Sequence, residues 1–418
     1  MRITESMVDD GDAEAMAPFI SRVRLKNYKS IAECDVRLKP LTILVGPNGA
    51  GKSNFLDALA FLVRAVATSP AEAIEERGGL DEILCRVPNQ TESFSIDIEV
   101  SVPWWPDRGE SNATYRFEIG RNERRRRGFE VVNEDCSIRS PGWTAGSSLT
   151  AGFSGGRGEA HFFGKDRAAA EANFEADRLL LPVAGTQGSF AQLYVGLSRP
   201  RFYNFAIDVL RRPQRQATGV TLQRSGEGLG DVLSRLSSQR PDVKTRIDAY
   251  ISAVVHEMST IKADAVGGYA TVALETSING KQFRFDSVSM SDGTIRAAAV
   301  LAALFQPESL DGRLPLIGIE EPEVALHPGA AGVLFDALTE ATEHVQVIAT
   351  SQSADLLDRE DLDVSVIRPV ALQGGLTVIG EVDDASREIV KEKLFTLGEL
   401  MRSNQIVPQP PDSTSIEA

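Results

Sequence analysis

A glycine-rich stretch constrains the fold of this chain more than any other feature. Residues 46–53 have the spacing G-x-x-x-x-G-K-S, and the apolar run directly before them, at 41–45, is typical of a buried strand. Glycines let the backbone turn so that several N–H groups converge on one phosphate, and the N-terminus of the following helix attracts the same anion. A chance glycine turn would lack the strand and the helix on either side. The pattern therefore predicts a phosphate-binding loop (P-loop) at the end of a strand.

The loop also predicts its ligands. Lys52 is expected to reach the β- and γ-phosphates of ATP, and the Ser53 hydroxyl is expected to bind Mg²⁺. ATP and Mg²⁺ are therefore the expected cofactors, and Lys52 is also a predicted catalytic residue. The residues expected to contact the nucleotide are Gly46, Pro47, Asn48, Gly49, Ala50, Gly51, Lys52, Ser53 and Asn54.

Composition limits the classes of protein to which the chain can belong. A length of 418 residues is enough for two or three compact units. No apolar run reaches the roughly 18 residues of a membrane span, and the acidic N-terminus does not resemble a signal peptide. The three scattered cysteines are typical of a reduced protein, so a cytoplasmic location is expected. The net charge of −15 argues against a general affinity for nucleic acid but leaves room for a local basic groove.

Hydrophobic periodicity divides the chain into six parts. Alternation with period two around residues 94–138 predicts antiparallel strands, while the glycine- and serine-rich residues 140–158 read as a loop or a mobile lobe. From residue 291 helices and strands alternate, which predicts a parallel sheet and an α/β fold. The predicted parts are a disordered tail (1–18), the N-terminal half of the ATPase domain (19–89), a β-rich insert (90–186), a helical lobe (187–265), the C-terminal half of the ATPase domain (266–401) and a second disordered tail (402–418).

Two adjacent carboxylates end another apolar strand, at residues 314–319. Glu320 is expected to hold the magnesium ion, and Glu321, which points the other way, is expected to activate the attacking water. The alternative is an acidic turn without a catalytic role. Adjacent carboxylates repel one another unless a cation or a base function offsets the repulsion, which favours the catalytic interpretation.

Four motifs in a fixed order resemble the ABC-type ATPases of the RecF/SMC/OLD group. They are the P-loop at 46–53, Ser291-Asp-Gly-Thr294 at a helix start, Glu320-Glu-Pro-Glu323 followed by Leu326-His-Pro328, and Ile348-Ala-Thr-Ser-Gln-Ser353. Residues 25–30, Leu-Lys-Asn-Tyr-Lys-Ser, are similar to the family's L-x-N-F-[KR]-S strand. The resemblance covers about residues 20–370 and does not extend to the Toprim nuclease domain of OLD proteins. It implies a P-loop NTPase with a split, ABC/SMC-head-like nucleotide-binding domain, an antiparallel β insert and a helical lobe.

The resemblance assigns Ser291, Asp292 and Gly293 to the ABC signature, which contacts the γ-phosphate bound to the other subunit. A small hydroxyl residue and a glycine at a helix start suit anion binding, although an ordinary Ser/Asp helix cap is the alternative. Leu326 and His327 fall where the family's dimer-contacting D-loop lies, with His327 in place of the usual aspartate. A purely structural role for His327 remains equally open.

Two positions depart from the family pattern. Gln352 stands where the family usually has a switch histidine, and glutamine can bond a phosphate or water but cannot carry charge. Gln352 is therefore a predicted catalytic residue with an altered chemistry. For the family's glutamine loop, which contacts the metal, Gln187 is the first candidate and Gln90 the competitor. An ordinary surface glutamine is the favoured alternative for each of them.

The resemblance also implies partners. A signature that acts in trans implies a homodimer whose ATPase heads sandwich ATP, with DNA or a nuclease partner chain as the object acted upon and no membrane contact. DNA repair or phage defence is the corresponding setting, and the alternative is an ATPase subunit that regulates a protein or membrane-transport partner without contacting nucleic acid. For DNA phosphates, the candidate contacts are the basic run at 121–127 and the arginines Arg199, Arg201, Arg211, Arg212 and Arg215, with a solvated charged surface as the alternative.

Overall fold

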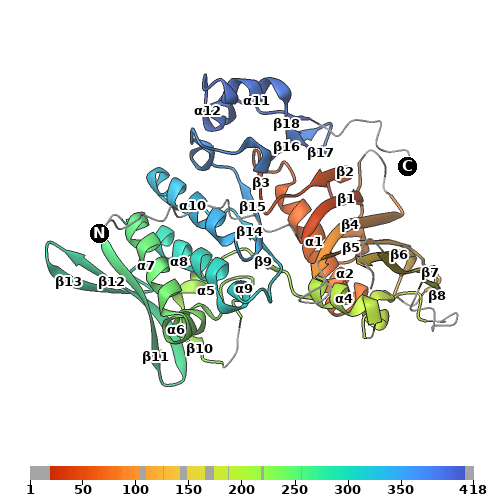
Figure 1. The fold of residues 1–418 in the computed structure, drawn as a ribbon, viewed down its shortest axis with the longest axis horizontal. Helices are drawn as coiled ribbons and strands as arrows, with labels where there is room; N and C mark the ends of the chain where they lie inside the picture. Colours follow the sequence, from red (N-terminus) through yellow and green to blue (C-terminus); the bar gives the residue numbers. More distant parts are fainter. Residues whose placement is uncertain are drawn as a thin grey trace, which may run out of the picture.

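The computed structural model describes residues 19–87, 89, 91–103, 110–125, 127–141, 148–164, 174–186, 188–217, 221–255 and 257–409. They form two large sheets, a third sheet of four strands and a two-stranded sheet, with helices on and between them (Figure 1). No helix within these ranges is long and apolar enough to cross a bilayer.

The strand that leads into the P-loop, β3 (Leu41–Val45), lies inside a six-stranded sheet. Four of the five pairings in this sheet are parallel, and only the pairing between its last two strands in sequence is antiparallel. Every residue of β3 is buried, as expected for a parallel strand covered on both faces. The sheet confirms the predicted α/β fold. Its order is β17 (Leu376–Ile379), β16 (Ile367–Gln373), β3, β15 (Gln346–Ser351), β14 (Leu316–Glu320) and β9 (Arg201–Tyr203).

This sheet separates two hydrophobic cores. Leu44 of β3 packs into the core that contains α1 (Lys52–Ala67), while its neighbours Ile43 and Val45 pack into the core of α8 (Asp292–Phe305) and α10 (Ala331–Ala341). The helices therefore cover opposite faces of the sheet (Figure 1). Because alternate residues of one strand hold both layers, the P-loop is fixed between them.

The second large sheet is antiparallel and has seven strands. Its order is β2 (Ile31–Arg37), β1 (Ile20–Tyr28), β4 (Ser93–Pro103), β5 (Glu110–Arg121), β6 (Phe129–Pro141), β7 (Ser148–Gly156) and β8 (Glu159–Gly164). The predicted boundary at residue 90 cuts across this sheet, because β4 pairs with β1 along most of its length. The strands predicted for the insert are thus continuous with those of the N-terminal half.

The glycine-rich region 140–158 was expected to form a loop, and that expectation is wrong where the structure describes it. β7 runs through it and pairs with both β6 and β8. A Cβ at Gly152 would collide with the Phe163 ring, and one at Gly156 would collide with the backbone of Val132. The glycines therefore mark close packing between strands, which a local pattern cannot distinguish from a loop.

An aromatic cluster fixes α1 on the antiparallel sheet. Phe61 of α1 packs edge-on against Phe94 of β4, with ring centroids 5.2 Å apart, and Phe94 in turn packs against Tyr28 of β1 at 5.6 Å. All three rings are fully buried. Burial of each such side chain stabilises the fold by about 2–3 kcal/mol, so the helix that begins at the P-loop has a firm base.

The predicted helical lobe also contains strands. A third sheet is built from β10 (Gln214–Arg215), β11 (Met258–Val266), β12 (Tyr269–Ile278) and β13 (Lys281–Asp286). The helices of this region and the short helices elsewhere are α2 (Pro70–Glu75), α3 (Leu181–Ala184), α4 (Ala191–Ser198), α5 (Ile207–Arg211), α6 (Leu229–Gln239), α7 (Pro241–Val255) and α9 (Pro307–Leu310). The 3₁₀ turns are η1 (Leu80–Glu82), η2 (Gly188–Phe190), η3 (Pro328–Ala330), η4 (Ala354–Leu357) and η5 (Val364–Val366).

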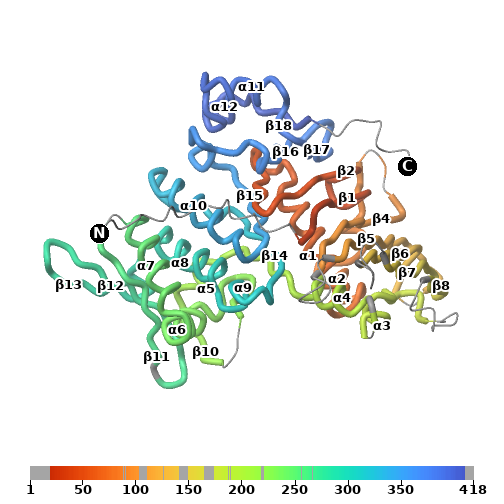
Figure 2. Tube along the Cα trace, in the orientation of Figure 1, coloured from red at the N-terminus to blue at the C-terminus, as the bar shows by residue number. Residues whose placement is uncertain are grey.

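The C-terminal region returns to the first strands of the chain. Figure 2 shows the blue strands β16 and β17 beside the red N-terminal segment, where β16 pairs with β3. Two helices follow, α11 (Asp384–Lys391) and α12 (Leu397–Arg402). The predicted disorder from residue 402 is wrong up to Gln409, because β19 (Pro408–Gln409) pairs with β18 (Glu381–Val382). The predicted tails at 1–18 and 410–418 lie outside the described residues.

Candidate functional site

The P-loop connects the end of β3 to the start of α1 with a backbone that requires glycine. Gly49 and Gly51 have left-handed φ angles of 75° and 102°. A Cβ at Gly51 would also collide with the Thr377 side chain of β17. Because glycine alone combines this conformation with this close approach, the loop can keep the shape in which its N–H groups face an anion.

Lys52 lies over the loop that it follows. Its ammonium donates hydrogen bonds to the carbonyl oxygens of Gly46 at 2.7 Å and Pro47 at 3.0 Å. Burial lowers the pKa of Lys52, and the negative charges of Glu321 and Glu323 oppose that effect. Lys52 is only 5 % exposed, so its charged group is buried against the backbone of the loop. A cation at this position suits phosphate binding.

The second half of the site meets the first through a direct hydrogen bond. The Ser53 hydroxyl donates to Glu320 Oε2 at 2.8 Å, although the two residues are 267 positions apart. Glu320 ends β14, and parallel pairing of β14, β15 and β3 brings the carboxyl ends of these strands to one edge of the sheet. A hydroxyl and a carboxylate in contact are oxygen ligands of the kind that Mg²⁺ prefers, so the residues fit the expected ion.

Glu321 takes a different direction from Glu320. Its φ of 44° is left-handed, which is uncommon for a residue with a side chain, and Thr350 fixes it by accepting two hydrogen bonds from its N–H. Glu321 Oε2 accepts a hydrogen bond at 3.2 Å from the side-chain amide of Gln352. The structure therefore brings together the two residues predicted to handle the attacking water.

Glu323 is a site residue to which the sequence interpretation gave no role. Its Oε1 accepts hydrogen bonds from the Ser351 hydroxyl at 2.6 Å and from the N–H of Gln352 at 3.2 Å. The side chain is 6 % exposed, and burial raises its pKa above the usual range. It thus fixes the backbone that carries Gln352. Its place in the Glu-Glu-Pro-Glu motif was the available signal.

The predicted signature lies at the start of α8. The Ser291 hydroxyl accepts a hydrogen bond at 3.1 Å from the N–H of Thr294, so the helix cap proposed as an alternative is present. Asp292 accepts a hydrogen bond at 2.6 Å from Arg211, an arginine that the sequence offered as a DNA contact. Gly293 packs so tightly against Ala325 that a Cβ would collide with the carbonyl oxygen of that residue.

The D-loop candidate adjoins the signature. His327 Nδ1 accepts a hydrogen bond at 3.1 Å from the N–H of Gly329 and so caps η3. Within the described ranges, no hydrogen bond or ion pair joins the signature residues Ser291, Asp292 and Gly293 to residues 46–54. A role of the signature toward a second copy stays a prediction. Gln187 and Gln90 lie outside the described residues.

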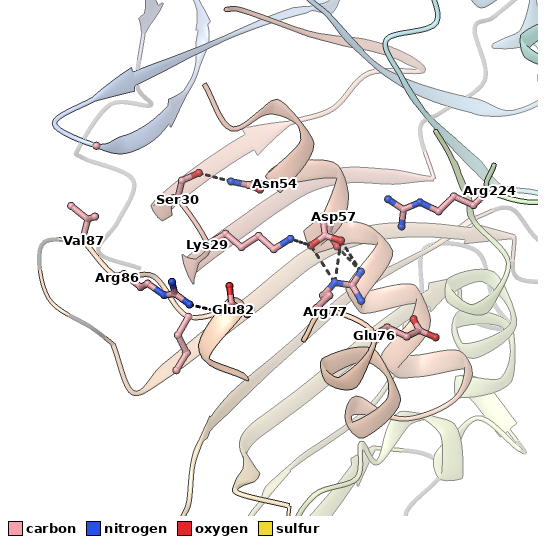
Figure 3. Close-up of a pocket in the computed structure, with 12 residues that line it drawn as sticks. Lys29, Ser30, Asn54, Asp57, Glu76, Arg77, Glu82, Arg86, Val87 and Arg224 are labelled. Atoms are coloured by element: carbon pink, nitrogen blue, oxygen red, sulfur yellow. Dashed lines mark hydrogen bonds and ion pairs between the residues drawn. The ribbon is translucent and has the colours of Figure 1, made fainter. Parts of the chain in front are cut away.

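A cavity of about 700 Å³ lies beside α1 (Figure 3). Asn54, a predicted nucleotide contact, donates a 2.6 Å hydrogen bond across it to the Ser30 hydroxyl of the N-terminal strand motif. Deeper in the cavity, Asp57 binds Lys29 at 2.5 Å and Arg77 at 2.9 Å. Burial raises the pKa of Asp57, but the two cations outweigh it, and the net shift is downward.

Comparisons with known proteins identify the relatives of this arrangement. The family described as "AAA domain, putative AbiEii toxin, Type IV TA system" matches residues 41–358, which include the P-loop, the signature and both strand-end glutamates. The chain is also similar to a solved structure, the SmcHead bound to the C-winged helix domain of ScpA. That likeness has a TM-score of 0.52 at 13 % identity and covers 88 % of this chain and 100 % of the other. It supports the fold.

Two curated proteins are similar to parts of the chain. The DNA replication and repair protein RecF of Corynebacterium jeikeium (strain K411) is 49 % identical over 45 residues, which are 10 % of this chain and 11 % of that protein. The OLD nuclease of Thermus scotoductus (strain ATCC 700910 / SA-01) is 24 % identical over 356 residues, which are 81 % of this chain and 60 % of that protein. The chain thus spans less than two thirds of the length of these relatives.

Proposed function

The chain belongs to this AAA-domain family, and from its P-loop NTPase fold and site we propose that it binds and hydrolyses ATP with Mg²⁺ as a homodimeric switch of the RecF/SMC/OLD type. The observation that carries the proposal is the 2.8 Å hydrogen bond between Ser53 and Glu320. It joins the two halves of a split site at the point where nucleotide and metal ligands have to meet.

Each residue of the site has a distinct part in this proposal. The N–H groups of the loop and the ammonium of Lys52 would bind the phosphates, and Ser53 and Glu320 would hold the magnesium ion. The ion neutralises phosphate charge when it is bound. Glu321 accepts the proton of the attacking water, and the 3.2 Å hydrogen bond from Gln352 orients its carboxylate. Glu323 supports Gln352 from behind through the backbone.

We extend the proposal to a second copy of the chain. The signature residues lie at the start of α8, and none of their described hydrogen bonds reaches the P-loop of the same chain, which supports a role toward a phosphate on another chain. Closure of two copies around two ATP molecules would then be favoured by the affinity of ATP for the closed state. Hydrolysis removes that affinity and reopens the pair.

For the object of the switch, we propose DNA or a nuclease-bearing partner chain. The similarity to a DNA replication and repair protein and to a nuclease supports this proposal. The structure weakens the case for DNA binding by the basic run at 121–127. Its arginines Arg121, Arg125 and Arg127 each pair with a carboxylate of the same chain. This neutralisation favours the second candidate, an ATPase that regulates a protein partner without contacting nucleic acid.

The proposal is tested by comparing wild type with Glu321→Gln, with and without DNA. We expect Glu321→Gln to lower turnover by about 10²–10⁴-fold, the usual contribution of a general base, while it still binds ATP and accumulates as an ATP-bound dimer. Glu343→Gln, a change at an exposed glutamate away from the site, is the matched control and should behave as wild type. Normal turnover of Glu321→Gln would refute the mechanism. If DNA neither binds nor stimulates turnover, the protein-partner candidate replaces DNA.

A further inference from the structure

Arg224 contacts the proposed magnesium ligand from the helical lobe. Its guanidinium lies 3.6 Å from Glu320 Oε1, the carboxylate oxygen that Ser53 does not use. Figure 3 shows Arg224 at the edge of the cavity beside α1. The arginine side chain is 58 % exposed, so the fold does not depend on its burial. The contact is therefore suited to being made and broken.

The backbone of Arg224 is tied to the end of strand β9. The N–H of Asn204 donates to the carbonyl oxygen of Arg224 at 2.9 Å, and the N–H of Ala206 donates to that of Ser225 at 3.0 Å. Residues 204–206, which directly follow β9, are thus hydrogen-bonded to the turn that carries Arg224. A change in the position of this turn acts directly on the segment that follows β9.

The same segment is clamped to the start of the signature helix. At its far end, Arg211 donates to Asp292 at 2.6 Å and to the carbonyl oxygen of Met290 at 2.8 Å. The carbonyl oxygen of Arg211 accepts a hydrogen bond from Ser287 at 2.8 Å. In the middle of the segment, Arg296 of α8 donates to the carbonyl oxygen of Phe205 at 3.2 Å. Contacts therefore run without a break from Glu320 through residues 204–211 to Asp292.

We propose that Arg224 and Arg211 couple the magnesium site of this chain to the position of its own signature. The inference rests on the proposed function. A magnesium ion bound to Glu320 weakens the ion pair between Glu320 and Arg224, because the metal ion and the guanidinium compete for the same carboxylate. Loss of that anchor loosens residues 204–211 and the signature that Arg211 holds. Since the signature serves the nucleotide of the partner chain, the occupancy of one ATP site alters the other.

Hydrogen exchange of the full-length chain with Mg²⁺ and ADP tests this coupling. ADP has no γ-phosphate for a second signature to contact, so only the route within one chain is measured. Protection of a peptide containing the P-loop reports binding, and exchange in a peptide spanning 287–296 reports the signature. In wild type we expect Mg²⁺-ADP to protect the first peptide and to speed exchange in the second by about two- to fivefold, the range that an exposed ion pair supports.

In Arg224→Gln, the peptide 287–296 should already exchange faster than in wild type when no nucleotide is present. Addition of Mg²⁺-ADP should then change the exchange rate of this peptide little. Arg211→Gln should do the same, because it breaks the other end of the connection. Arg212→Gln is the matched control, since Arg212 directly follows Arg211 at the end of α5 but pairs only with Asp208, at 3.3 Å, among the described ion pairs. If both variants match Arg212→Gln while the P-loop peptide is protected, the coupling is overturned and the proposed function stands. If Mg²⁺-ADP leaves the wild-type P-loop peptide unprotected, the proposed function fails as well.

Discussion

The nucleotide site has a Walker half, made of the P-loop with Glu320, Glu321 and Gln352, and a signature half, residues 291–293, and the two differ in how completely one chain assembles them. In the Walker half, Ser53 bonds Glu320 at 2.8 Å and Gln352 bonds Glu321 at 3.2 Å, so the proposed metal ligands meet one another, and so do the two residues proposed to handle the attacking water. In the signature half, the Ser291 hydroxyl is used for the cap of its own helix. The side chains of the Walker half therefore contact one another as in a binding site. Those of the signature half contact only their own region of the chain.

Because of this difference, we expect nucleotide binding and hydrolysis to depend on different residues. A chain that carries a complete Walker half can bind ATP by itself. Hydrolysis needs charge stabilisation around the γ-phosphate, which the proposed function assigns to the signature of a second copy. Substitutions in the first half should then impair both steps, and substitutions in the second half only hydrolysis.

The largest effect is expected from Lys52→Ala. It removes the ammonium that lies over the P-loop, so both ATP affinity and turnover should fall, turnover by about 10²–10³-fold. Titration with a fluorescent ATP analogue measures the first and phosphate release the second. Lys393→Ala, at an exposed lysine 3.9 Å from Glu360, is the control. Wild-type affinity in Lys52→Ala would show that the Walker half is not the binding site.

The next largest effect on turnover is expected from a substitution in the signature half. Ser291→Asp keeps a side chain that caps α8 but places a negative charge where a γ-phosphate is expected. Turnover should fall by about 10²-fold, while ATP affinity and the melting temperature stay close to wild type. Ser291→Ala, which loses the cap, should instead lower stability by about 1 kcal/mol. Full turnover in Ser291→Asp would leave the cap as the sole role of this residue.

A smaller effect is expected from Gln352→Ala within the Walker half. Without the amide that bonds Glu321, the carboxylate loses its orientation, and kcat should fall by about tenfold with little change in ATP affinity. Steady-state kinetics separates the two quantities. Gln405→Ala, at an exposed glutamine in the C-terminal region, serves as the control. An equal loss of affinity would mean that Gln352 contributes to binding as well as to the reaction.

The smallest effect concerns stability and pH. Burial raises the pKa of Glu323 above its ordinary value of 4.5. Protonated Glu323 therefore stabilises the fold at pH values below 4.5, and this stabilisation is lost as the pH rises through the pKa of the folded state. Glu323→Gln cannot lose a proton. Thermal melts from about pH 5 to about pH 8 should show the variant gaining stability relative to wild type as pH rises. Parallel curves would mean that Glu323 keeps one charge state throughout.

The comparison also explains which parts of the site the sequence predicted. Residues 46–53 and Glu320 lie in contiguous motifs whose local chemistry dictates their geometry, so a pattern is enough to find them. The left-handed φ of Glu321 is different, because Thr350 on the neighbouring strand imposes it. Arg224 has no motif at all. Its turn is held near Glu320 by hydrogen bonds from Asn204 and Ala206, which follow β9, and such tertiary contacts leave no local pattern.

The fold was predictable to a similar degree. Alternating helices and strands after residue 291 are a local signal, and the parallel sheet followed from them. The pairing of β1 with β4 joins segments about 70 residues apart and leaves no local trace, so the continuous antiparallel sheet was not foreseen. The same holds for β19, which pairs with the distant strand β18.

Mixing two inactive variants tests the central claim, that the ATP site is completed by two chains. Lys52→Ala chains keep a working signature, and Ser291→Asp chains keep a working P-loop. Hybrid dimers then contain one intact site, so the mixture should recover up to about a quarter of wild-type turnover although each variant alone is inactive. No recovery in mixtures shown to form hybrid dimers would mean that the signature acts within its own chain, and the two-chain site would be wrong.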